Sequence, residues 1–379
     1  MTCVWQSHWY RSRQGKHLYI NKKIYAMHCT CLAGTEQGML NTVYRLVAPR
    51  RFEVCFNNID LSSGQAVVRP ARLSICHADQ RYYQGLRPAE VLGQKLPMAL
   101  IHEGTGCVVY DPSGTFPYGT EVVMVPNTPV EYDSVIAENY LRSSRFRASG
   151  FDGFMQENVA LALDRLVPLA PSTDKAVAAF TELVSVSVHA MRRFDRAAHS
   201  RRKVTGIWGD GNLGYITALV SKAMYPGTKL YIFGTDREKL SRFSFAEETF
   251  LVADIPEDIS VDHAFECVGG SASQKAVNQI IGCIEPEGTI SLLGVSEYPV
   301  PVNTRMVLEK GLHIQGSSRS GREDFIETIA LYKKYPWLAR YLGNIVGTEI
   351  EVHTTEDIVK AFETDIQMGM GKTIMVWNQ

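Results

Sequence analysis

The chain has 379 residues, of which 45% are hydrophobic and 21% charged, and its formal net charge is −1. This length exceeds one ordinary hydrophobic core and predicts two domains. The near-neutral charge argues against a nucleic-acid partner, and no apolar run approaches the ~20 residues that cross a membrane. The eight cysteines follow no regular spacing and no secretion signal is recognisable, which predicts a reduced, cytoplasmic protein.

The first 38 residues differ in texture from the rest. They mix tryptophan, lysine and histidine without helical or strand periodicity, and they contain no apolar signal segment. We therefore expect residues 1–38 to form a poorly ordered N-terminal extension, and ordered structure to begin at about Met39.

A strand-rich segment follows, from about residue 43 to residue 72, in which short apolar runs are interrupted by glycine and proline. Further short strands are expected at residues 105–110 and 121–126. Short strands separated by frequent turns predict a compact, mainly β domain.

From about residue 176 the pattern changes to longer helical stretches that alternate with buried strands. Four such strands are expected at residues 205–208, 229–233, 263–265 and 289–293. Alternating strands and helices are typical of βαβ units, in which the strands form a parallel sheet. The predicted fold class is therefore α/β, with a doubly wound parallel sheet of the Rossmann type next to the β domain.

A glycine motif, Gly209-x-Gly211-x-x-Gly214, directly follows the strand that ends at Trp208. The first glycine permits a tight turn, the second lets a pyrophosphate approach the backbone, and the third allows close packing of helix on strand. A pyrophosphate would lie at the N-terminus of the next helix, where free N–H groups favour an anion. The sequence thus predicts a dinucleotide site formed by Gly209, Gly211, Asn212, Leu213 and Gly214.

The end of the strand expected at residues 229–233 bears on the choice between NAD and NADPH. An enzyme that uses NAD usually places a carboxylate there, on the ribose 2′-hydroxyl. If Gly234 holds this position, no carboxylate repels a 2′-phosphate and NADPH is favoured, with Thr235, Arg237 and Lys239 as its ligands. If the register slips by two residues, Asp236 becomes the ribose acid and the cofactor is NAD. We favour NADPH.

Three separate segments supply candidate ligands for a catalytic metal, namely Cys76, His102 and Glu182. A thiolate, an imidazole and a carboxylate suit Zn²⁺, and three protein ligands leave a fourth position for substrate or water. Glu103 follows His102 directly, so in extended backbone their side chains point apart. If a turn brings Glu103 round it is a fourth ligand, and otherwise it is a nearby base. We expect Cys76, His102, Glu103 and Glu182 to form both the metal site and the catalytic site.

These segments carry a family resemblance. Cys76-x-x-Asp79 followed by Ile-His-Glu-Gly at 101–104 resembles the catalytic domain of zinc-containing medium-chain alcohol and polyol dehydrogenases. Residues 182–189 resemble the sorbitol dehydrogenase segment in which a glutamate is the third zinc ligand. The resemblance implies a GroES-like catalytic domain into which the Rossmann domain is inserted. It also implies one zinc ion, because no cysteine lies between Cys107 and Cys267 to form a structural zinc lobe.

The implied domain order has four parts. After the extension, residues 39–185 form the catalytic zinc domain and residues 186–315 the NADP-binding domain. Residues 316–379 return to the catalytic domain.

A closer similarity, to the ribulose-5-phosphate reductases, rests on residues 74–83, 207–217 and 307–321. This resemblance implies Zn²⁺ and NADPH-dependent reduction of D-ribulose 5-phosphate to D-ribitol 5-phosphate. It also implies a partner enzyme, ribitol-5-phosphate cytidylyltransferase, which makes CDP-ribitol for teichoic acids or capsules, and we expect a homo-oligomer. Many relatives relay a proton through a Ser or Thr two residues after the zinc cysteine, where this chain has Ala78, so its proton path stays open.

A substrate phosphate needs arginine or backbone N–H donors, and the candidates are Arg81, Arg147 and Arg319. Two other readings remain open. One is an NAD-dependent polyol or threonine-type dehydrogenase, and the other is a non-catalytic nucleotide-binding or scaffold protein that has kept the fold.

Overall fold

The computed structural model describes residues 38–379 of the chain. The extension predicted for residues 1–38 therefore lies outside the described residues, apart from Gly38, which begins the first strand. Within the described part, no helix combines the length and the apolar character needed to span a membrane.

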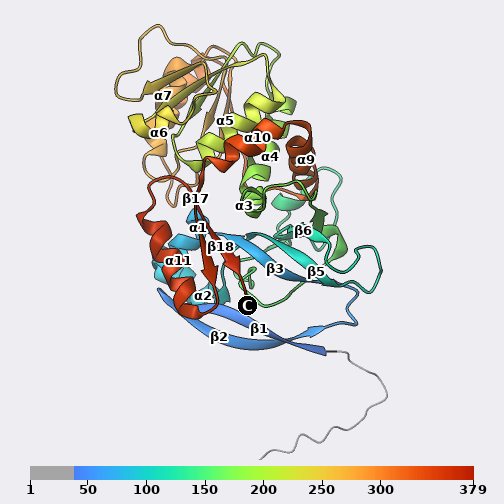
Figure 1. Ribbon diagram of the computed structural model, residues 1–379. Helices are drawn as coiled ribbons and strands as arrows, with labels where there is room; N and C mark the ends of the chain where they lie inside the picture. Colours follow the sequence, from blue (N-terminus) through green and yellow to red (C-terminus); the bar gives the residue numbers. More distant parts are fainter. Residues whose placement is uncertain (1–37) are drawn as a thin grey trace, which may run out of the picture. The chain divides into compact units, whose positions relative to one another are not determined.

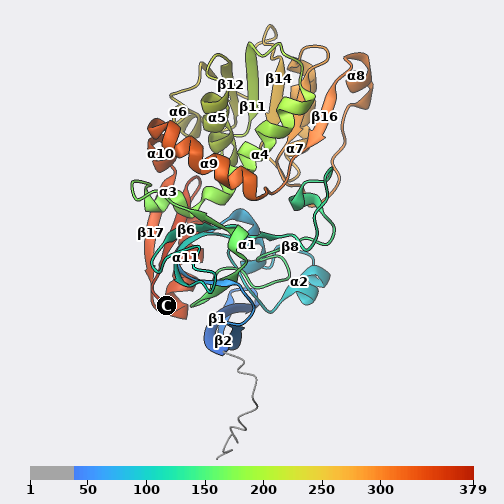
Figure 2. The same ribbon diagram turned by 90° about the vertical axis from the view of Figure 1, so that its right-hand side faces the viewer.

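A six-stranded, fully parallel sheet forms the nucleotide-binding half of the fold, and Figure 2 labels β12, β11, β14 and β16 across it. The strand order β13-β12-β11-β14-β15-β16 reverses direction between β11 and β14, which is where doubly wound sheets bind their ligands. The strands are β11 (Val204–Trp208), β12 (Lys229–Gly234), β13 (Glu248–Leu251), β14 (His263–Glu266), β15 (Thr289–Leu292) and β16 (His313–Gly316).

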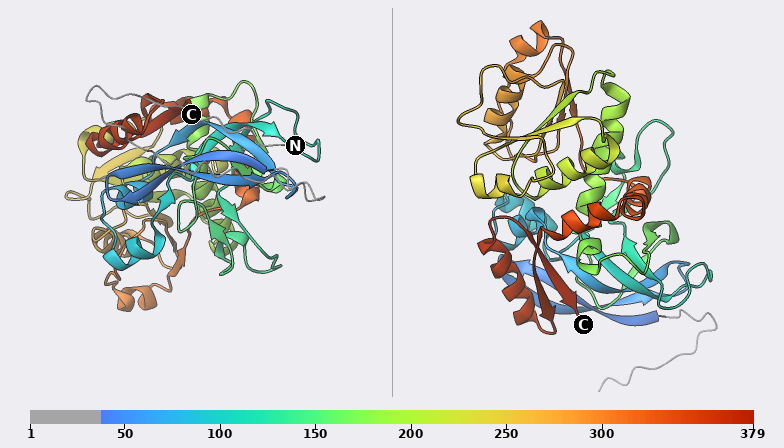
Figure 3. Two further views of the ribbon diagram at one scale, coloured as in Figure 1. Left: turned by 90° about the horizontal axis from the view of Figure 1, so that it is seen from below. Right: turned by 45° about the horizontal axis from the view of Figure 1, so that its top comes forward.

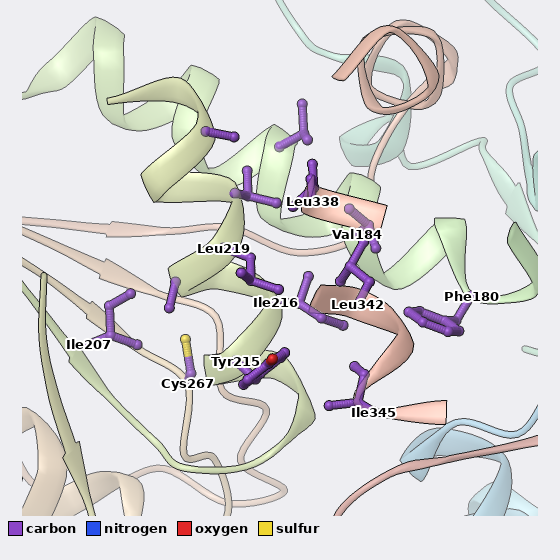
Figure 4. Close-up of a cluster of buried hydrophobic side chains, with 14 of the residues drawn as sticks. Phe180, Val184, Ile207, Tyr215, Ile216, Leu219, Cys267, Leu338, Leu342 and Ile345 are labelled. Carbon is purple, nitrogen blue, oxygen red and sulfur yellow. The ribbon is translucent and has the colours of Figure 1, made fainter. Parts of the chain in front are cut away.

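Helices cover this sheet on both faces because successive strand residues point to opposite sides. Ile207 of β11 joins one hydrophobic core, shown in Figure 4 with Tyr215, Leu338 and other side chains, whereas the neighbouring Trp208 joins a second core. The first core includes residues of α4 (Thr181–Ala197), α5 (Asn212–Met224), α9 (Arg322–Lys334) and α10 (Pro336–Gly343). The second includes residues of α7 (Ser273–Cys283), α8 (Thr304–Glu309) packs against it, and α6 (Arg237–Ser241) follows β12.

The catalytic half is built on a mainly antiparallel sheet of order β10-β6-β5-β3-β18-β17, with β9 also paired to β3. The C-terminal strands lie beside β3, so the chain returns to this sheet after the nucleotide-binding segment (Figure 1). The strands are β3 (Ala66–Ser74), β5 (Glu103–Tyr110), β6 (Glu121–Met124), β9 (Val159–Leu161), β10 (Leu166–Pro168), β17 (Val346–Val352) and β18 (Lys372–Trp377).

Smaller elements complete this half. A second sheet has the order β2-β1-β4, and Figure 3 shows the red C-terminal segment beside the blue N-terminal strands. These elements are β1 (Gly38–Ala48), β2 (Arg51–Asp60), β4 (Met98–Ala99), β7 (Asn127–Thr128), β8 (Arg145–Phe146), α1 (His77–Tyr83), α2 (Ala89–Lys95), α3 (Lys175–Ala179) and α11 (Thr355–Gln367).

The predicted fold class is confirmed: a Rossmann sheet is inserted in a mainly β, GroES-like domain. The domain boundaries stay a prediction. The boundary proposed after residue 185 falls inside α4, and the one after residue 315 falls at the end of β16. Beyond β16, α9 and α10 still pack with α4 and α5 before the chain reaches β17.

Candidate metal and nucleotide site

Cys76 stands between β3 and α1, and it caps the N-terminus of that helix. Its Sγ accepts a hydrogen bond from the backbone N–H of Ala78 at 3.2 Å. In return the carboxylate of Asp79 accepts the backbone N–H of Cys76 at 3.2 Å, so the two residues form a capping box. Local sequence therefore fixes the direction in which the thiol points.

His102 and Glu103 approach the same point from the start of β5. The backbone at Ile101 lies in the left-handed region, with φ 70°, which is a strained conformation for a β-branched residue. Sγ of Cys76 lies 3.4 Å from Nε2 of His102. One candidate ligand atom each from Cys76, His102 and Glu103 lies within 4.8 Å of the other two, so the structure brings these three residues together.

Asp79 links the two segments that carry these groups. Its buried carboxylate accepts the backbone N–H of Ile101 at 3.0 Å, and the same oxygen lies 3.8 Å from Nδ1 of His102. A carboxylate behind a ligating histidine fixes the orientation of the ring. Asp79 is thus placed to orient the His102 ring.

Glu103 is held by a residue from the far end of the chain. Nζ of Lys372, in β18, lies 2.9 Å from Oε2 of Glu103 and donates a hydrogen bond to the carbonyl of Ile75 at 2.7 Å. Both charged side chains are almost completely buried. Burial alone would lower the pKa of Lys372, but Glu103 and Cys76 raise it above its usual value, so the lysine stays charged.

Glu182 is in the first turn of α4 and is also buried, but its carboxylate lies outside the 4.8 Å group. Burial raises the pKa of Glu182 to about 7, while the nearby His102 opposes that shift. Burial likewise raises the pKa of the Cys76 thiol, with His102 again opposing. For His102 the balance is reversed: burial would lower its pKa, but Cys76 and Asp79 raise it well above its usual value.

These groups fit a zinc ion. Sulfur, imidazole and carboxylate form the borderline-soft donor set that zinc prefers, and a dication would replace the protons that the buried groups otherwise share. Nδ1 of His102 is buried without a hydrogen-bond partner in the described part of the chain, and Asp79 is the polar group beside it.

The nucleotide loop has the geometry that its glycines predicted. Gly209 has φ 129°, a conformation that L side chains rarely adopt. A Cβ on Gly214 would lie 1.9 Å from the carbonyl oxygen of Gly209, whereas a Cβ on Gly211 would meet nothing within 4 Å. The backbone at Gly211 therefore faces open space where a pyrophosphate can approach.

The two residues between the last glycines have other contacts as well. Asn212 donates to the carbonyl of Gly371 at 2.6 Å and accepts from the N–H of Gly371 at 2.9 Å. Leu213 packs against the first hydrophobic core. Their side chains are occupied, so as cofactor ligands these residues would act through their backbone N–H groups.

At the end of β12 the structure places an acid that sequence reasoning missed. Oδ2 of Asp210 accepts the backbone N–H groups of Thr235 at 2.6 Å and of Asp236 at 2.9 Å. A Cβ on Gly234 would lie 2.6 Å from this carboxylate, so a larger residue there requires Asp210 to move. Asp236 itself caps α6 by accepting from Glu238 and Lys239.

This arrangement bears on the cofactor choice. The carboxylate of Asp236 accepts hydrogen bonds from the first turn of its own helix, α6. Gly234 is the last residue of β12, and a glycine at this position has no carboxylate to repel a 2′-phosphate. The backbone donors of the turn are also taken, by Asp210. Recognition of a 2′-phosphate would therefore depend on side chains, of which Arg237 is exposed and Lys239 half-buried.

The three candidate phosphate-binding arginines differ in their surroundings. Arg81, in α1, pairs with Glu297 from the loop after β15. Arg147 donates to the backbone carbonyls of Asp152 at 3.2 Å and Ala160 at 2.7 Å, and burial lowers its pKa to about 10. Within the described residues, Arg319 alone of the three has neither a hydrogen bond nor an ion pair, and its guanidinium carbon lies 4.5 Å from the ring centre of Phe146.

The comparisons with known proteins agree with this geometry. Residues 62–171 match the family model "Alcohol dehydrogenase GroES-like domain", and residues 243–334 match "Zinc-binding dehydrogenase". The fold and the site thus define a zinc-binding dehydrogenase of the medium-chain class.

Comparison with individual relatives identifies the family within this class of dehydrogenases. The chain is 56% identical over 339 residues to "Ribulose-5-phosphate reductase 1" of Staphylococcus aureus, covering 89% of this chain and 99% of that one. It is 44% identical over 343 residues to the Streptococcus pneumoniae ribulose-5-phosphate reductase, covering 89% and 98%. A crystal structure of S. aureus TarJ with NADPH superposes with a TM-score of 0.81 at 51% identity, covering 90% of this chain and all of that one. The chain belongs to the ribulose-5-phosphate reductase family.

More distant structures share only the fold. L-idonate 5-dehydrogenase from Escherichia coli matches with a TM-score of 0.77 at 20% identity, covering 89% of this chain and 99% of that one.

Proposed function

We propose that this protein reduces D-ribulose 5-phosphate to D-ribitol 5-phosphate with NADPH, using one zinc ion. The observation that carries the proposal is the buried group of Cys76, His102 and Glu103, in a chain 56% identical to a named ribulose-5-phosphate reductase. A zinc ion held by these residues would act as a Lewis acid on the substrate carbonyl, NADPH would supply the hydride to its carbon, and a proton from solvent would complete the alcohol.

The residues of the chain have separate tasks in this reaction. Cys76 and His102 are the primary ligands, and Glu182 is proposed as the third, as the resemblance to sorbitol dehydrogenase implies. Lys372 pairs with Glu103, so this carboxylate would stand beside a bound zinc ion as a fourth, exchangeable group. Asp79 keeps the His102 ring in its ligating orientation.

The cofactor is placed by the glycine loop and by the turn that follows β12. Gly209, Gly211 and Gly214, with the backbone of Asn212 and Leu213, would receive the pyrophosphate. Thr235, Arg237 and Lys239 would receive the 2′-phosphate. The TarJ structure with NADPH, 51% identical to this chain, supports this choice of cofactor.

The wider setting is also part of the proposal. The product would pass to ribitol-5-phosphate cytidylyltransferase, which makes CDP-ribitol for teichoic acid or capsule synthesis. We place the reaction in the cytoplasm, where NADPH and a reduced Cys76 are maintained. A homo-oligomer is supported by the edge strand β16, since Ile314 on it and Val295, Tyr298 and Leu308 nearby are exposed hydrophobic residues.

The test measures the reaction rate on a panel of substrates through the absorbance of the reduced nicotinamide. Ribulose 5-phosphate, sorbitol, xylitol and threonine are each assayed with the matching reduced or oxidised form of both NADP and NAD. The proposal predicts that ribulose 5-phosphate with NADPH has the highest kcat/KM. A higher value for an unphosphorylated polyol or threonine with NAD would favour the polyol or threonine-type enzyme. Nucleotide binding without turnover of any of them would favour a non-catalytic protein.

A further inference from the structure

The surroundings of Tyr82 stand out among the parts of the molecule not yet assigned. This tyrosine is in α1, six residues after Cys76, and only 2% of its surface is exposed. Its hydroxyl group is buried and has no hydrogen-bond partner in the part of the chain that the structure describes. Leaving a buried hydroxyl without a partner is unfavourable, so such a group commonly marks a place where something else binds.

A second unsatisfied group lies against the same ring. The guanidinium carbon of Arg87 is 4.3 Å from the ring centre of Tyr82. Nε of Arg87 is buried and has no hydrogen-bond partner among residues 38–379, and no ion pair to this arginine is found there. A half-buried guanidinium stacked on an aromatic ring keeps its planar set of donors in one orientation.

Arg319 approaches from the segment after β16. Its backbone lies in the left-handed region, with φ 58°, and its guanidinium stacks on Phe146, whose ring centre is 5.3 Å from that of His102. Burial lowers the pKa of Arg319, and the neighbouring Glu182 and Tyr82 oppose that shift. The guanidinium is therefore near enough to Glu182 and to Tyr82 to interact with both.

Other cations nearby are already compensated or engaged. Arg81 pairs with Glu297, and Nζ of Lys95, which is 6.0 Å from the ring centre of Tyr82, donates to the hydroxyl of Ser149 at 3.1 Å. Among the cations around Tyr82, Arg87 and Arg319 are therefore those without a partner in the described chain. Two guanidinium groups and one phenol hydroxyl are the donors that a phosphate dianion prefers.

We propose that Tyr82, Arg87 and Arg319 form the subsite that binds the phosphate group of the substrate. This inference rests on the proposed function and adds to it the residues that distinguish a sugar phosphate from a free sugar. Arg319 also lies beside the metal group. The subsite can therefore hold the phosphate of a short sugar phosphate while the carbonyl group of that substrate faces the metal group. Arg87 and Tyr82 replace Arg81 and Arg147 as its main donors.

The test compares Arg87→Ala and Tyr82→Phe with the unchanged protein on two substrates, ribulose 5-phosphate and unphosphorylated D-ribulose. We expect kcat/KM for ribulose 5-phosphate to fall roughly 10- to 100-fold in Arg87→Ala, mainly through KM, and several-fold in Tyr82→Phe. The value for D-ribulose should change by less than about twofold, because that substrate has no phosphate to lose. Inorganic phosphate should inhibit the unchanged protein competitively and Arg87→Ala much more weakly.

Arg50→Ala is the matched control. Arg50 stacks on the next tyrosine of the same helix, Tyr83, at 5.5 Å, but it pairs with Glu363. This variant should keep its preference for the phosphorylated substrate, and zinc content and NADPH affinity show that each variant is folded. Equal losses on both substrates, or an unchanged KM for ribulose 5-phosphate in Arg87→Ala, would overturn the subsite. If the unchanged protein used D-ribulose as well as ribulose 5-phosphate, the proposed function itself would fail.

Discussion

Lys372 and Glu103 form a buried ion pair of 2.9 Å across 269 residues of sequence. The residue before the lysine, Gly371, exchanges two hydrogen bonds with Asn212 of the nucleotide loop. One short segment before and at the start of β18 therefore contacts both the cofactor loop and the metal group. This segment therefore fixes the position of the cofactor loop relative to the metal group.

Removing the lysine should destabilise the protein strongly. Lys372→Met leaves the charge of Glu103 buried without a partner, which typically costs about 3–5 kcal/mol. The double variant Lys372→Met with Glu103→Gln should recover much of this loss, because no charge is then buried alone. Urea unfolding of the metal-free proteins measures the free energy of unfolding of each variant, because a bound Zn²⁺ would itself compensate the charge of Glu103. Lys175→Met is the control, since Lys175 and Glu121 form a partly exposed pair expected to contribute under about 1 kcal/mol. A similar small loss for Lys372→Met would contradict this account.

Adding one methyl group to the nucleotide loop should weaken cofactor binding. In Gly214→Ala the new Cβ would lie 1.9 Å from the carbonyl oxygen of Gly209, so the loop must move away from its present path. We expect the Kd for NADPH, measured by fluorescence titration, to rise at least about tenfold while zinc content stays the same. Gly227→Ala is the control, because its Cβ would meet no atom within 4 Å. Unchanged NADPH binding in Gly214→Ala would exclude this loop as the pyrophosphate site.

Asp210 should influence which nicotinamide cofactor binds. In Asp210→Ala the backbone N–H groups of Thr235 and Asp236 lose their acceptor, and the turn that carries the 2′-phosphate ligands loosens. We expect the Kd for NADPH to rise about tenfold and the Kd for NADH to change much less. Asp210→Asn keeps an acceptor oxygen and removes a negative charge, so it should bind NADPH at least as tightly as the unchanged protein. Titrations with NADPH and NADH measure these affinities. An equal loss of affinity for both cofactors would show that Asp210 merely supports the fold.

Asp324 should contribute to stability in a way that depends on pH. Burial would raise its pKa, but the hydrogen bond with His189 and the charge of Arg192 lower it below its usual value. A carboxyl whose pKa is lower in the folded state contributes stability above its unfolded pKa of about 3.9. That contribution is lost as the pH falls through the folded pKa.

The comparison is between the unchanged protein and Asp324→Asn, with unfolding free energies measured from pH 6 to pH 3. The unchanged protein should lose more stability over this range than the variant, because the amide does not titrate. Metal release in acid affects both proteins alike, since Asp324 is not among the grouped ligand residues. Parallel curves for the two proteins would refute the effect.

Much of the fold could be predicted because it follows from the local pattern of apolar and polar residues. The strands that begin near residues 205, 229, 263 and 289 are mostly buried and rich in apolar residues, and the structure has them within one residue at each end. The strands β13 and β16 were missed because they are partly exposed and carry polar residues, as edge strands do.

The site was harder to predict, because its parts are distant in sequence. Nothing near Lys372 indicates that it faces Glu103, and nothing near Asp210 indicates that it reaches the turn after β12. For Glu103 the sequence left two possibilities, and the structure adds the strained backbone at Ile101, which no residue pattern reveals. No residue pattern indicates the buried contacts of His189, whose ring nitrogens lie within hydrogen-bond distance of Asp324 and Tyr140.

The most direct test of the account is the rate of NADPH oxidation by ribulose 5-phosphate before and after removal of zinc. We predict that the zinc-loaded protein turns over, that dialysis against a chelator reduces the rate at least about 100-fold, and that added Zn²⁺ restores it. Cys76→Ser should lack both zinc and turnover while it still binds NADPH. An undiminished rate in the metal-free protein would show that zinc takes no part in the reaction.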